Sequence, residues 1–102
     1  MSNFTVEDLA HRRVRIDMLD LSLLELLNQR TAIVEEIGHI KQELRLAIYE
    51  PKREDAVFAN VLGHNRGPLP DDAVKRIFER IIDEMRNVQK LKIVERHGNE
   101  PC

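Results

Sequence analysis

Apolar side chains in the first half of the chain recur at alternating intervals of three and four residues. This spacing places them along one side of an α-helix, as in the seam of a coiled coil. Two positions of this spacing hold arginines instead of apolar residues, Arg12 and Arg30. The pattern predicts one long helix with an apolar seam, whose members are Leu9, Ile16, Leu19, Leu23, Leu26, Ile33, Ile37, Ile40 and Leu44.

Helix-breaking residues and capping signals set the limits of three predicted helices. All four prolines follow residue 50, and Gly38 is the only earlier glycine, so little stops a first helix that begins near the capping pair Thr5 and Asp8. Pro51 suits the first position of a second helix, which Gly63 ends. No segment alternates with a period of two, so we expect no strand. The predicted helices cover about residues 5–47, 51–62 and 70–95, with a frayed tail at 97–102.

The length of the first helix bears on the oligomeric state. A chain of 102 residues predicts one domain over residues 1–102. A helix of some 40 residues is about 65 Å long, whereas a compact domain of this size has a radius of gyration near 13 Å. The two shorter helices can cover only part of the seam. We therefore expect an all-α homodimer in which a second copy of the chain covers the rest.

Charge and composition exclude several classes of partner. The 16 lysines and arginines stand against 18 aspartates and glutamates, which gives a net charge of −2 and no polybasic segment. Nucleic acid and anionic membrane surfaces are therefore not expected partners. No apolar run is long enough to span a bilayer, and acids and arginines near the start stand where a signal peptide has its apolar core. The expected compartment is the cytoplasm.

Metal and nucleophilic chemistry find little support in the sequence. Cys102 is the only cysteine, so neither an intrachain disulfide nor a cysteine metal cluster can form. The four histidines form no H-x-x-x-H pair, and no serine has the sequence context of a nucleophile. We expect neither a metal nor a cofactor.

Polar residues at apolar positions are the candidates for function. Arg30 stands in the seam, and Lys41, eleven residues later, falls on the same helix face within about 20°. A buried guanidinium must snorkel, pair with a carboxylate or bind an anion, and a structural salt bridge is the plainer reading. Gln89 lies at the edge of the apolar stripe of the third predicted helix, where a boundary residue is the usual interpretation. Gly38 could mark a close helix approach or be a tolerated glycine.

In sequence order, these residues resemble the signature of a known family. An arginine precedes Ile-Asp and a second aspartate in a leucine-rich helix (Arg13, Ile16-Asp17, Asp20). A second arginine, a glycine and a lysine follow (Arg30, Gly38, Lys41). The second helix opens with acid, base and glutamate, and the third carries a glutamine; these are Glu50, Arg53, Glu54 and Gln89. The chain thus resembles the all-helical class of chorismate mutase from about Leu9 to Gln89.

The resemblance implies an intertwined all-α homodimer that rearranges chorismate to prephenate in phenylalanine and tyrosine biosynthesis, without covalent catalysis. Each site would take Arg13 from the other subunit. Arg13 and Arg30 would bind the substrate carboxylates, and Lys41 and Gln89 would donate to the ether oxygen. Glu54 would accept from the ring hydroxyl, while Glu50 would contribute through its backbone at the helix start. The residues implied in substrate binding are Arg13, Arg30, Lys41, Glu50, Arg53, Glu54, Met85 and Gln89, with Lys41, Gln89 and Arg30 catalytic.

One position departs from the family pattern, and two other functions stay open. Met85 stands where many members carry a small hydroxyl residue, and since methionine cannot donate to a carboxylate, apolar packing is the alternative to a substrate contact. A lyase of the same fold that removes pyruvate from isochorismate uses a very similar set of cations. A non-catalytic dimerisation module is the other alternative. The sequence is compatible with a complex with another shikimate-pathway enzyme but identifies none.

Overall fold

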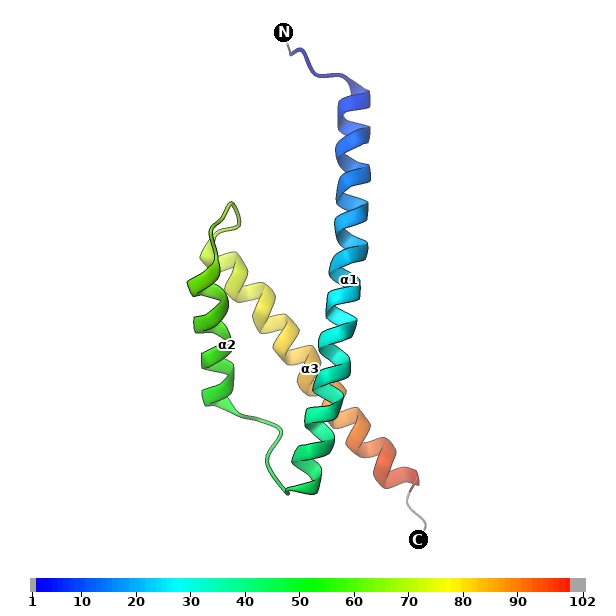
Figure 1. The fold of residues 1–102 in the computed structure, drawn as a ribbon, viewed down its shortest axis with the longest axis vertical. Helices are drawn as coiled ribbons and strands as arrows, with labels where there is room; N and C mark the ends of the chain where they lie inside the picture. Colours follow the sequence, from blue (N-terminus) through cyan, green and yellow to red (C-terminus); the bar gives the residue numbers. More distant parts are fainter. Residues whose placement is uncertain (1, 100–102) are drawn as a thin grey trace. The chain divides into compact units, whose positions relative to one another are not determined.

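Three α-helices make up the described part of the chain, and no strand occurs there. The computed structural model describes the backbone of residues 2–99 and the side chains of residues 2–93. The helices are α1 (Val6–Glu43), α2 (Pro51–His64) and α3 (Asp71–Asn99), as Figure 1 shows. The prediction of an all-helical chain with a very long first helix is confirmed.

The packing of the chain separates two units. The first, residues 1–32, contains the N-terminal part of α1, and the second, residues 33–102, contains the rest of α1 together with α2 and α3. The single domain over residues 1–102 stays a prediction.

A capping box starts α1 as the sequence indicated. The Thr5 backbone N–H donates to the Asp8 carboxylate at 2.8 Å, and the Asp8 N–H donates to the Thr5 hydroxyl at 3.2 Å. Two N–H groups that the helix cannot pair internally are thereby satisfied. The first turn also carries Glu7, whose negative charge favours this end of the helix dipole.

The end of α1 differs from the prediction, since the helix stops at Glu43 and not near residue 47. Arg45 adopts a left-handed conformation with φ of 56°. The N–H of Leu46 donates to the carbonyl of Lys41 at 2.7 Å, and that of Arg45 donates to Gln42 at 3.2 Å. These two bonds form a Schellman motif. Because arginine stands where glycine is usual, no stop signal was visible in the sequence.

The limits of the other two helices shift slightly. α2 begins at Pro51 as predicted but continues through Gly63 to His64. The amide of Asn65 then donates to the Leu69 carbonyl and the Asp71 carboxylate at 2.8 and 2.7 Å, which ties the connecting loop to the start of α3. α3 reaches Asn99, so residues 97–99 of the expected frayed tail are helical. Residues 100–102 of that tail lie outside the described residues.

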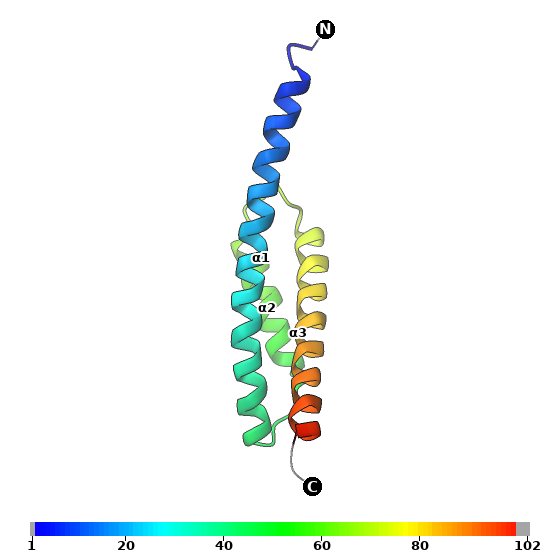
Figure 2. The same cartoon turned by 90° about the vertical axis from the view of Figure 1, so that its right-hand side faces the viewer.

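Within the second unit, α2 and α3 run in opposite directions and contact each other (Figures 1 and 2). Its apolar core is small, because among the described residues only Val34, Val74, Ile82 and Met85 are buried hydrophobics. The buried residues of α1 are Val34, Gly38 and Lys41, at intervals of four and three. The segment 33–43 of α1 therefore buries one helical face within this unit.

The predicted seam is a different face of α1. Its nine apolar members are each between 40% and 68% exposed in the single chain. Ile33, Ile37 and Ile40 each precede a buried residue by one position, which is a rotation of about 100°. The seam thus has no cover within the described chain. No helix in the described residues is long and apolar enough to cross a membrane.

Candidate functional site

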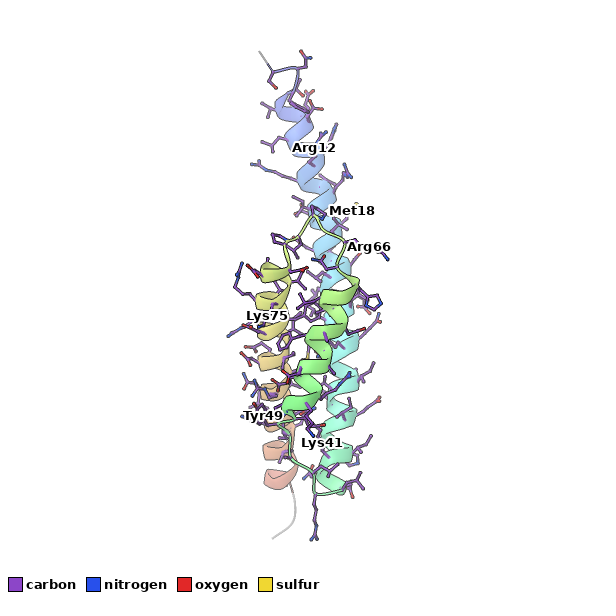
Figure 3. All side chains as sticks on the ribbon, turned by 90° about the vertical axis from the view of Figure 1, so that its left-hand side faces the viewer. Arg12, Met18, Lys41, Tyr49, Arg66 and Lys75 are labelled. Atoms are coloured by element: carbon purple, nitrogen blue, oxygen red, sulfur yellow. The ribbon has the colours of Figure 1, made fainter. Side chains whose placement is uncertain are left out.

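Lys41 is the first of two buried polar side chains among the described residues of the second unit. It is 8% exposed, although it is a lysine. Its Nζ donates to the Ile48 carbonyl at 2.9 Å and lies 2.6 Å from Oε1 of Glu50. Both partners belong to the linker between α1 and α2. Figure 3 shows Lys41 and Tyr49 near the lower end of α2. An ammonium group has three donors, so two partners among the described residues leave it one for a ligand.

Gln89 of α3 is the second buried polar side chain, at 6% exposed. Its Nε2 donates to the Val34 carbonyl of α1 at 3.2 Å. Because only the NH₂ end of the amide can donate, this bond fixes which way the amide faces, and the second N–H has no acceptor among the residues that the structure describes. Gly38 makes this approach possible, since a Cβ there would lie 3.2 Å from Cγ of Gln89. Of the two interpretations of Gly38, close approach is the one that the structure supports.

Glu54 and Arg86 form the third element of the site. Oε2 of Glu54, on α2, lies 3.3 Å from Nε of Arg86, on α3, and their side chains are 20% and 30% exposed. The Arg86 guanidinium carbon lies 5.2 Å from the centre of the Tyr49 ring, within range of a cation–π interaction. Sequence reasoning missed Arg86 and Tyr49, because their roles depend on how α2 packs against α3.

The remaining predicted residues of the second unit take different positions. The Glu50 side chain pairs with Lys41, and the expected contribution of its backbone to substrate binding stays a prediction. Its carbonyl does accept the N–H of Glu54 at 3.0 Å. Arg53 is exposed and forms no ion pair among the described residues. Met85 is buried in the apolar core at 8% exposed, in line with packing.

Arg13 and Arg30 belong to the first unit. Arg13 is exposed. Arg30 is half-buried and already interacts with another group of the protein. Lys41, Glu50, Glu54 and Gln89 all belong to the second unit, where Lys41 pairs with Glu50, while Arg13 and Arg30 belong to the first.

The arrangement in the second unit suits the binding of a polar ligand whose oxygens accept hydrogen bonds. Lys41 and Gln89 are buried, each is held by a backbone carbonyl, and each keeps a donor. Buried donors that are already oriented interact more strongly with developing negative charge than mobile donors in water do. Glu54 adds an acceptor, since its Oε1 has no hydrogen-bond partner among the described residues.

Comparison with known proteins gives a consistent result. Residues 12–90 match the family described as chorismate mutase type II. A bifunctional chorismate mutase/prephenate dehydratase of Neisseria gonorrhoeae is 38% identical over 90 residues, which cover 88% of this chain. The chain spans about a quarter of the length of that relative, 24%.

Solved structures match over more of their length. A chorismate mutase (form II) of Thermus thermophilus superposes with a TM-score of 0.79 at 32% identity, covering 80% of this chain and 93% of that one. A chorismate mutase from Helicobacter pylori, solved in complex with prephenate, gives a TM-score of 0.79 at 30% identity, covering 85% and 94%. Both the fold and the sequence thus connect the chain to one family.

Proposed function

Because the chain belongs to the type II chorismate mutase family, we propose that it is an isomerase that rearranges chorismate to prephenate. The observation that carries the proposal is the pair of buried donors, Lys41 and Gln89, each oriented by a backbone carbonyl. A dimerisation module would gain nothing from burying these two polar groups with donors unused. The Helicobacter pylori relative, whose structure contains prephenate, supports the same substrate class.

The rearrangement breaks a C–O bond and forms a C–C bond within one molecule, so it needs no nucleophile. Negative charge grows on the ether oxygen in the transition state. We assign Lys41 and Gln89 as the donors to that oxygen, since interactions that strengthen in the transition state raise the rate. Glu50 and the Ile48 carbonyl hold the Lys41 ammonium in place, so that little reorganisation accompanies the reaction.

Cations bind the two carboxylates of the substrate in this proposal. Arg13 and Arg30 each offer a planar fork of donors that fits a carboxylate, and Arg53 adds a third cation at the start of α2. Holding both carboxylates brings the reacting carbons together, which removes much of the entropic part of the barrier. Glu54 accepts a hydrogen bond from the ring hydroxyl. Met85, which is buried in the apolar core of the second unit, supplies packing.

We further propose a homodimer in which Arg13 enters the site of the partner subunit. The exposed apolar seam of α1 supports this proposal, because nine apolar side chains in one line are costly to leave in water. We also propose a cytoplasmic location and an association with another enzyme of the pathway. The name of the Neisseria gonorrhoeae relative contains two activities, which supports such an association.

An ultraviolet assay of chorismate consumption tests the proposed activity. We expect the purified chain to consume chorismate and to form prephenate, identified by mass spectrometry after separation. Isochorismate is the control substrate, because the alternative lyase would release pyruvate from it. Pyruvate from isochorismate without prephenate from chorismate would overturn the proposal in favour of the lyase, and no product from either would favour a dimerisation module.

A further inference from the structure

Arg86 connects three parts of the second unit. Its Nε lies 3.3 Å from Oε2 of Glu54 on α2, and its Nη2 donates to Asp83 of α3 at 2.5 Å. Its guanidinium also lies over the ring of Tyr49, in the linker between α1 and α2. One side chain of α3 thus touches both the start of α2 and the linker that also binds Lys41.

These contacts differ from an ordinary surface ion pair. The Nε of Arg86 is buried and makes no hydrogen bond among the described residues. Its interaction with Oε2 of Glu54 is an ion pair whose geometry is not that of a hydrogen bond. The Glu54 side chain is only 20% exposed, so its carboxylate has lost much of its water. A partly buried carboxylate requires a compensating cation, and Arg86 is the one that the described residues supply.

The geometry leaves one oxygen of Glu54 available. Arg86 approaches Oε2, and Oε1 has no hydrogen-bond partner among the described residues. Tyr49 and Asp83 also contact the guanidinium, which limits its freedom to move and cover both oxygens. The ion pair at Oε2 favours carboxylate orientations in which Oε1 stays available to a hydrogen-bond donor.

We propose that Arg86 is a positioning residue that holds Glu54 in the orientation that accepts the ring hydroxyl of the substrate. The inference rests on the proposed function, in which Glu54 makes that contact. Arg86 itself does not touch the substrate; it acts through Glu54, and the Tyr49 ring keeps its guanidinium plane in place.

A double-mutant cycle on prephenate formation tests this role. We expect Arg86→Met to lower kcat/KM about 10- to 100-fold, in line with the cost of a misplaced contact group. In a Glu54→Gln background, Arg86→Met should lower kcat/KM by less than about twofold, because the group that Arg86 orients is already altered. Arg86→Lys, which keeps the charge, should recover part of the loss.

Matched controls separate positioning from folding. Arg80 also pairs with a glutamate on α3, Glu84 at 2.8 Å, but both side chains are more than half exposed. Arg80→Met should leave kcat/KM unchanged, and circular dichroism should show each variant to be helical. If Arg86→Met fails to fold, Arg86→Lys takes its place in the cycle.

The possible failures are distinguishable. An Arg86 variant that is folded and fully active, or one that loses as much in the Glu54→Gln background as in the parent, would overturn the positioning role alone. A parent chain that forms no prephenate would overturn the proposed function and this inference with it.

Discussion

Gly38 of α1 and Gln89 of α3 are in direct contact, and the absence of a side chain at Gly38 is what allows it. A Cβ at position 38 would lie 3.2 Å from Cγ and 3.6 Å from Cβ of Gln89. The same contact brings the Gln89 amide to the Val34 carbonyl, one turn earlier on α1. The glycine therefore sets the distance between the two helices where a proposed catalytic donor is held.

Replacing this glycine should impair activity more than folding. We expect Gly38→Ala to displace Gln89 by a few tenths of an ångström and to lower kcat/KM about tenfold. The higher helix propensity of alanine, up to about 1 kcal/mol, offsets part of the crowding in the free energy of unfolding. Gly63→Ala in α2 is the matched control, since its Cβ would meet no atom within 4 Å. Equal activity of the two variants would contradict the prediction.

Lys41 should be indispensable for turnover. Lys41→Met keeps an apolar stem of similar length but removes the donors, so we expect kcat to fall about 10²- to 10³-fold. The Ile48 carbonyl loses its partner, at a cost of about 1–3 kcal/mol in the free energy of unfolding. Steady-state kinetics and chemical unfolding measure the two effects. Lys90→Met, at an exposed position of α3, should change neither; a Lys41→Met chain with parental kcat would remove Lys41 from the mechanism.

Gln89→Glu should make the activity dependent on pH. A glutamate donates a hydrogen bond only when protonated, and its ordinary pKa is near 4.3. At neutral pH the ionised carboxylate would oppose the charge that develops on the ether oxygen. Activity should therefore be low at neutral pH and rise on acidification, while the parent stays comparatively flat. Burial raises the pKa of an introduced carboxyl, whereas a Lys41 ammonium that donates to the same oxygen lowers it, so the direction of the profile and not its midpoint is the test.

Asn87→Asp is the control for that profile, because Asn87 is an exposed amide on the same helix. Its pH dependence should follow the parent. If the Gln89→Glu chain is fully active at neutral pH, Gln89 does not donate to the ether oxygen and is only a boundary residue of the stripe.

The seam of α1 should mediate dimerisation. Sedimentation velocity of the parent at micromolar concentration should give a dimer. Leu23→Glu places a charge in the seam, where the residue is 55% exposed in the single chain, and should shift the distribution towards monomer. A folded parental monomer at that concentration would rule out the dimer.

A shared site should allow two inactive variants to complement each other. Arg13→Ala and Arg30→Ala chains should each lose most of their activity. If Arg13 comes from the partner subunit, a heterodimer of the two has one site with both arginines intact. Refolding them together should restore part of the parental activity. Heterodimers that form, as shown by mass spectrometry, without any recovery would place both arginines in the same subunit's site.

Local features of the fold could be predicted well from the sequence. The Thr5 and Asp8 capping box and the Pro51 start of α2 depend on neighbours within one turn, and both are found where expected. The end of α1 could not be predicted, because Arg45 takes a left-handed conformation that is typical of glycine and rare for arginine.

The contacts of the site were harder to predict, because they join distant segments. Lys41, Glu50, Glu54 and Gln89 were all identified as candidates, but the pairing of Lys41 with Glu50 depends on the path of the linker after α1. The role of Arg86 depends on how α2 lies against α3. Periodicity also could not show that α1 uses two faces, with Val34, Gly38 and Lys41 buried beside a separate open seam.

The open seam of α1 has a consequence for how the chain would behave at different expression levels. If folding and association are one process, the law of mass action links the stability of the protein to its own concentration. Each tenfold dilution of such a dimer lowers the apparent free energy of unfolding by about 1.4 kcal/mol. A chain whose apolar core holds only four buried hydrophobics among its described residues has little reserve against that loss. The abundance of the protein would then itself determine what fraction of it is folded.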